Sequence, residues 1–139
     1  MDLTNRKLWR AGLALAVAVS AAVPAATQGT GEVPVLARLE RGLWQLRLID
    51  GGRNALAPVC IGDPAILTQL QHRDRRCSRS VVSTGRDSVA VRYSCPELGL
   101  GLTTIRVETP RLARIESEGV DNGVPFGFRA EARRVGACG

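Results

Sequence analysis

The chain has 139 residues and a formal net charge of +6 at pH 7, a length that allows one domain with a modest core. Arginines carry the positive charge, apart from Lys7, and they are dispersed among acidic residues. No basic stripe is interleaved with aromatic side chains, so the composition argues against nucleic-acid binding. The densest charge, Arg-Asp-Arg-Arg at 73–76, is typical of a solvated turn, with contact to an anionic surface as the alternative.

The first 26 residues have the zones of a secretory signal peptide: a basic start, an apolar run over 11–23 and small residues up to Ala26. The apolar run has 13 residues, whereas a membrane-spanning helix needs roughly 20. We therefore expect residues 1–26 to be removed near Thr27, with an uncleaved anchor as the alternative. The mature chain is then expected to work outside the cytoplasm, without a stable membrane span.

All four cysteines, Cys60, Cys77, Cys95 and Cys138, lie in the exported part, and an even number in an oxidising compartment predicts two disulfides. Their spacings of 17, 18 and 43 include no short ligand pair, so a metal site is not expected. Pairing Cys60 with Cys77 would clip the intervening segment to the sheet and leave Cys95 for Cys138. A regular hairpin centred on Arg86 would instead place Cys77 opposite Cys95. We favour the first arrangement.

Residues 27–40 contain Gly29, Gly31 and Pro34 and predict a flexible leader, so the folded domain is expected over 41–139. The run 42–49 alternates between apolar and polar residues, which indicates a half-buried strand. Asp-Gly-Gly at 50–52 predicts a tight turn into a second, shorter strand over 55–60.

Asp63 and Pro64 are a helix N-cap and first-turn pair, and Ile66, Leu67 and Leu70 fall on one face. We therefore expect a helix over 64–72, the only one in the mature chain.

After this helix, short alternating runs are separated by turn residues. A hairpin around 84–87 should end at Cys95, and further strands are expected over 102–109, 112–118 and 126–135. Consecutive strands joined by short turns pair antiparallel. The predicted fold is mainly β (α+β): a curved antiparallel meander or open half-barrel of about six to seven strands, one short helix and two disulfides.

Five features occur in the order that is typical of one known family: the export signal, Gly-Leu-Trp-Gln at 42–45, a cysteine before the helix, the hairpin from Cys77 to Cys95, and Arg-Arg-Val-Gly-Ala-Cys at 133–138. Over about residues 40–138 the chain resembles the small exported proteobacterial family known only as domain of unknown function 3617. Arg41 stands where proline is usual, and 61–63 replace the usual Thr-Pro-Glu. The resemblance implies a periplasmic location and a four-cysteine scaffold, and it implies no activity.

His72 is the only histidine, so a Ser-His-Asp or Cys-His arrangement would have to use it. Its position at a helix C-terminus also has a structural explanation, because a base is favoured near the negative end of the helix dipole. Glu116 and Glu118 share one strand face, but neighbouring arginines favour a solvated surface over a catalytic carboxylate pair. We assign no catalytic residue.

Four aromatic residues follow the signal: Trp44, Tyr93, Phe126 and Phe128. At alternate positions on strands they are typical of a core, and the alternative is that some of them line a concave ligand pocket.

These features predict a non-enzymatic binding or interaction module of the cell envelope, with an apolar ligand or a protein partner and no cofactor. A small periplasmic hydrolase and a structural envelope-stress protein are the alternatives.

Overall fold

The computed structural model describes residues 33–49 and 55–139. Their strands form one seven-stranded antiparallel sheet in the order β2-β1-β7-β6-β5-β4-β3. The strands are β1 Gly42–Leu48, β2 Ala55–Ile61, β3 Ser78–Thr84, β4 Ser88–Cys95, β5 Gly99–Thr109, β6 Leu112–Asp121 and β7 Val124–Gly136. The predicted fold class is confirmed: a mainly β, open antiparallel sheet with a short helix and two disulfides.

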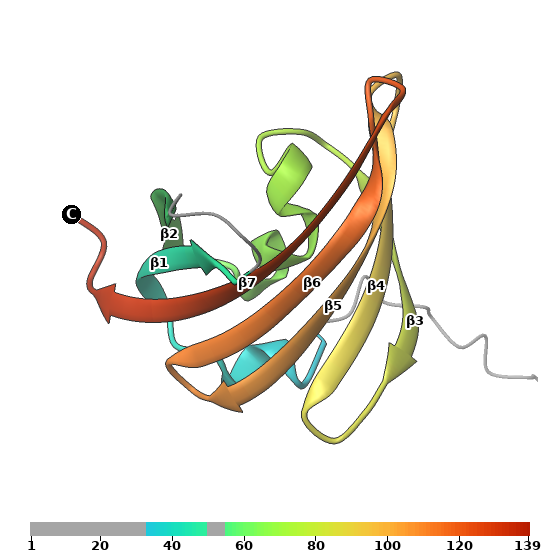
Figure 1. The fold of residues 1–139 in the computed structure, drawn as a ribbon. Coiled ribbons are helices and arrows are strands. Elements are labelled where there is room, and N and C mark those ends of the chain that lie inside the picture. Colours follow the sequence, from blue (N-terminus) through green and yellow to red (C-terminus); the bar gives the residue numbers. More distant parts are fainter. Residues whose placement is uncertain (1–32, 50–54) are drawn as a thin grey trace, which may run out of the picture.

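Two 3₁₀ helices, η1 (Leu36–Arg38) and η2 (Pro64–His72), lie against the inner face of the curved sheet (Figure 1). The predicted bounds of the second helix are confirmed, but its winding is 3₁₀ and it is interrupted at Gln69, whose φ/ψ of −135°/41° is not helical. Runs of 3₁₀ helix longer than three or four residues are uncommon because their hydrogen-bond geometry is poor. The kink at Gln69 therefore divides the segment into two short turns.

The core follows from the period-2 alternation of the strands. Along β4, for example, Val89, Val91 and Tyr93 are buried while the residues between them are exposed or half-buried. Leu67 of η2 and Trp44 of β1 are both 0% exposed, and full burial of one such side chain stabilises the fold by about 1.5–3 kcal/mol.

The folded domain begins earlier than predicted. Val35, Leu36 and Leu39 belong to the region assigned above to a flexible leader, yet all three are buried in the core. Arg38 also donates from Nη1 to Asp87 Oδ1 at 2.8 Å, which ties η1 to the β3–β4 hairpin and lowers the pKa of the Asp87 carboxyl. The predicted flexible leader therefore extends too far along the chain. The apolar residues that follow the glycines and proline of 27–34 pack against the sheet.

The favoured disulfide pairing was wrong. The bonds join Cys60 to Cys138 and Cys77 to Cys95. Cys60 lies on β2 and Cys77 just before β3, and these are the two opposite edges of the sheet, so they cannot be bonded. Instead Cys77 precedes Ser78, which pairs with Ser94, and this register places Cys77 beside Cys95.

Strand β1 lies between Cys60 and the C-terminal strand and sets how far apart they are. Leu43 lies between Cys60 on one side and Gly136 on the other, so the chain needs only two more residues beyond Gly136 to bring Cys138 to Cys60.

A close approach at Gly101 shapes the inner face of the sheet. Tyr93 lies directly opposite Gly101 in the register, and a Cβ atom at this position would be 2.6 Å from the Tyr93 ring. The ring therefore packs directly against the glycine, and its hydroxyl reaches His72 of η2.

We predict that Gly101→Ala lowers the free energy of unfolding by about 2 kcal/mol, because the Tyr93 ring must move out of a packed position. Urea unfolding followed by circular dichroism measures this change. Gly127→Ala is the matched control: the nearest atom to its new Cβ is 3.9 Å away, so a change within about 0.5 kcal/mol is expected. Equal effects of the two substitutions would contradict the assigned role of Gly101.

Candidate functional site

The segment that carries His72 is held at both ends by polar contacts. At the start of η2, Asp63 Oδ1 accepts a hydrogen bond from Ala65 N at 2.9 Å, which is the N-cap predicted from the sequence. At the end, the buried Gln69 amide donates from Nε2 to the carbonyls of His72, at 3.1 Å, and Arg75, at 2.9 Å. These bonds satisfy backbone acceptors that a short helix leaves open and fix the turn over 72–75.

His72 itself is 5% exposed and contacts two strands of the sheet. Its Nε2 lies 3.3 Å from Asp121 Oδ1 and its Nδ1 3.2 Å from the Tyr93 hydroxyl. The ring also makes edge-on contacts with Tyr93 and Phe126, at centroid distances of 5.6 and 6.2 Å. An ionised carboxylate can only accept, so we assign the Nε2 proton to the bond with Asp121.

Asp121 accepts three side-chain hydrogen bonds. Besides His72, Gln71 donates to Oδ2 and Asn122 to Oδ1, each at 2.8 Å. The Gln71 bond, the charge and hydrogen bond of His72, and the Asn122 bond together lower the pKa of the Asp121 carboxyl, against a smaller opposing effect of burial. The site therefore holds a carboxylate that stays ionised and is surrounded by donors.

Tyr93 continues the polar contacts into the core. Burial raises the pKa of its phenol and the negative charge of Asp121 raises it further, while a hydrogen bond from Ser117 acts in the opposite direction. The Ser117 hydroxyl is in turn 2.8 Å from that of Thr103. In the described part of the chain, no buried side-chain nitrogen or oxygen lacks a hydrogen-bond partner, so this polar network is satisfied and rigid.

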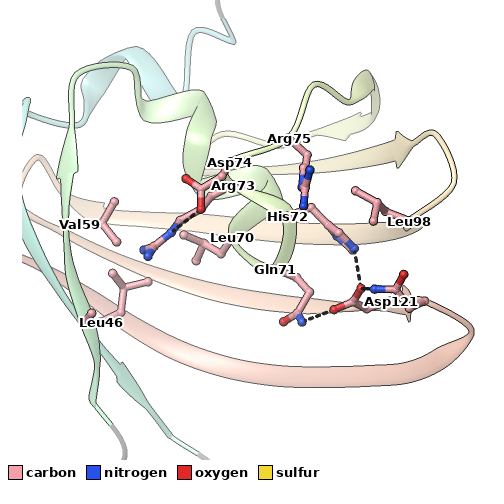
Figure 2. A pocket seen from close by; sticks show the side chains of 12 residues that line it. Leu46, Val59, Leu70, Gln71, His72, Arg73, Asp74, Arg75, Leu98 and Asp121 are labelled. Carbon is pink, nitrogen blue, oxygen red and sulfur yellow. Dashed lines mark hydrogen bonds and ion pairs between the residues drawn. The ribbon is translucent and has the colours of Figure 1, made fainter.

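A cleft of about 450 Å³ lies between η2, the turn after it and the sheet. Five apolar residues from four different segments contribute to its lining: Leu46, Ala57, Val59, Leu70 and Leu98. Figure 2 shows Leu46, Val59 and Leu70 together at one end.

The other end of the cleft is polar, and Figure 2 shows His72 and Gln71 directed at Asp121 there. The polar residues of the lining are Gln71, His72, Arg73, Asp74, Arg75, Asp121 and Asn122. The cleft is therefore amphipathic: apolar side chains predominate beside β1 and β2, where Figure 2 also shows Arg73 and Asp74, and the contact between His72 and Asp121 lies beside the β6–β7 turn.

The aromatic residues singled out in the sequence do not line this cleft. Trp44 is 0% exposed, and its indole donates from Nε1 to Glu40 O at 3.0 Å. Tyr93 is buried beneath His72, while Phe126 and Phe128 are half-buried and stacked on each other with centroids 6.3 Å apart. Phe126 also borders a separate hollow of about 450 Å³.

The two other candidate residues, both glutamates of β6, are far more exposed to solvent than His72. Glu116 and Glu118 are both exposed and alternate along β6 with the buried Ile115 and Ser117, so they lie on the outer face of the sheet, away from His72. The sequence reasoning missed Asp121 and Gln69. Asp121 begins the Asp-Asn-Gly turn between β6 and β7, and no local pattern marks its contact with a residue 49 positions earlier.

Within residues 33–49 and 55–139, no three His, Cys, Asp or Glu side chains are grouped as a metal site would require. No helix in the same ranges has the length and apolar character needed to cross a membrane. No family model, curated protein or solved structure matches the chain, so the functional argument depends on its own residues.

The hydrogen bond to Asp121 gives a testable pH dependence. Because the pKa of Asp121 is lower in the folded chain than its ordinary value of 3.8, the carboxylate stabilises the fold fully above that value. This contribution is lost as the pH falls through the lowered pKa.

We predict that Gln71→Ala raises the pKa of Asp121 toward 3.8, because the largest stabilising contact of the carboxylate is removed. An NMR titration of the Asp121 side-chain carbonyl measures the shift. Gln45→Ala, on β1, is the control and should leave the titration unchanged. An unaltered Asp121 titration in Gln71→Ala would show that the contact is absent in solution.

Proposed function

We propose that this protein is an exported, non-enzymatic binding module of the cell envelope, and that the cleft between η2 and the sheet holds a small amphipathic ligand. The observation that carries the proposal is the cleft itself. Its volume of about 450 Å³ falls within the roughly 300–1,000 Å³ of typical small-molecule sites.

The two ends of the cleft support a ligand with two chemical parts. Leu46 is 0% exposed and has no surface for a ligand, so the accessible hydrocarbon of the apolar end is that of the exposed Ala57 and the half-buried Leu70. Burial of ligand hydrocarbon against them is favourable by about 25 cal/mol per Å² of apolar surface. In small-molecule sites the apolar lining usually supplies most of the contact area, and a few polar groups fix the orientation of the ligand.

The rigidity of the polar end also favours binding. His72 and Asp121 are fixed by each other, by Gln71 and by Tyr93, so this wall of the cleft does not need to be ordered when a ligand arrives. A pre-formed site avoids the entropy cost of immobilising its side chains.

The proposed location rests on separate observations. The leader over 1–26 has the pattern of an export signal, and two disulfides are present with no free cysteine in the described part of the chain. Disulfides persist in oxidising compartments. Together these features support the periplasm.

We test the proposal by filling the cleft. Ala57 is exposed and lines it, so Ala57→Trp should obstruct the cleft without disturbing the core. With the neutral fluorescent probe N-phenylnaphthylamine, we expect binding by the wild-type chain and an affinity loss of roughly tenfold or more in Ala57→Trp, which corresponds to about 1.4 kcal/mol.

Thr104→Trp is the matched control, since Thr104 is an exposed strand residue between the buried Thr103 and Ile105 and faces away from the cleft. It should bind the probe like the wild type. Failure of the wild type to bind at millimolar probe, or equal affinities of the two tryptophan variants, would refute the cleft as the binding site.

A further inference from the structure

Four ionisable side chains other than His72 line the cleft, and the two acidic ones are not available to a ligand. Asp121 is occupied by three donors. The side chain of Asp74 is 88% exposed, and its nearest ion-pair partner, Arg73, is 3.8 Å away. A cationic ligand group would therefore have to displace bonds from Asp121 or be held in open solvent at Asp74.

The two arginines are placed differently. Arg75 is anchored through its backbone, because its N donates to His72 O at 3.0 Å and its O accepts from Gln69 Nε2 at 2.9 Å. In the part of the chain that the structure describes, no carboxylate lies within ion-pair distance of its guanidinium. The base of the side chain is fixed while its charged end is free to bind.

The donors of the lining other than the arginines are already engaged. Gln71, His72 and Asn122 all direct donors at Asp121, and Arg73 is ion-paired with Asp74 at 3.8 Å. Among the described residues, Arg75 is therefore the cationic donor of the lining that has no carboxylate partner. A guanidinium presents its N–H groups in a planar fork that matches a carboxylate or a phosphate. Partial shielding by the cleft walls strengthens such a contact relative to open water.

We infer that the ligand of this cleft is an amphipathic anion, whose carboxylate or phosphate is bound by Arg75 and whose hydrocarbon part lies against Ala57, Val59 and Leu70. This inference rests on the proposed function and adds the charge of the ligand to it. Recognition then combines an apolar end, which accepts a chain, with a cationic rim, which selects its head group.

The test compares ligands with one tail and different heads: octanoate, octyl phosphate, octan-1-ol and octylammonium. Binding is followed by NMR shifts of the Val59 and Leu70 methyl groups and by calorimetry. We expect octanoate or octyl phosphate to bind at least roughly fivefold more tightly than octan-1-ol, as for a partly exposed ion pair. Octylammonium should be the weakest ligand, and added salt should weaken only the anions.

Arg75→Gln should reduce the affinity for the anion to that for octan-1-ol and leave octan-1-ol binding unchanged. Arg76→Gln is the matched control, because Arg76 is the next residue in the chain and does not line the cleft. The ratio of anion to alcohol affinity also detects a variant that is merely misfolded, since misfolding weakens both ligands.

The outcomes separate the two claims. Equal binding of octan-1-ol and the anions by the wild type would overturn the inference and leave the proposed function standing. If none of the four ligands shifts the Val59 and Leu70 methyl groups at millimolar concentration, both claims fail. A preference between octanoate and octyl phosphate identifies which anionic group the rim is built for.

Discussion

The placement of η2 depends on His72, because this one side chain joins the helix to two separate parts of the sheet. Its ring bonds Tyr93 on β4 and Asp121 at the end of β6, and it is 5% exposed. A buried polar group without partners is costly by about 1–3 kcal/mol, so the position of η2 in which both ring nitrogens have partners is favoured. The cleft is the space that this position leaves between η2 and the strands β1 and β2.

The surrounding fold makes this arrangement possible. Gly101 allows the Tyr93 ring to pack directly against it and to reach His72, and the kink at Gln69 turns its amide onto the carbonyls of His72 and Arg75. The bond between Cys77 and Cys95 fixes the start of β3 immediately after the turn over 72–75. A close glycine contact, a helix kink, a disulfide and hydrogen bonds therefore all act on the segment that forms the polar end of the cleft.

Local sequence patterns predict those structural features that are determined by residues close together in the chain. The alternation around Val89 and Val91, and the Asp63 cap, correctly indicate strands and a helix, because burial by alternation and capping involve residues close in the chain. The disulfide pairing and the contact between His72 and Asp121 depend on strand order and join residues up to 78 positions apart. The leader was misassigned for the same reason, since Leu36 and Leu39 pack against strands much later in the chain.

The most direct test of this account is hydrogen exchange of the backbone amides in the wild type and in His72→Ala. If His72 holds η2 in place, the amides over 66–75 should exchange at least roughly tenfold faster in the variant, since at least about 1.4 kcal/mol of local stability is lost. The amides of β5 and β6 should keep their protection. Unchanged exchange over 66–75, or an equal acceleration throughout the sheet, would contradict the claim that His72 specifically positions η2.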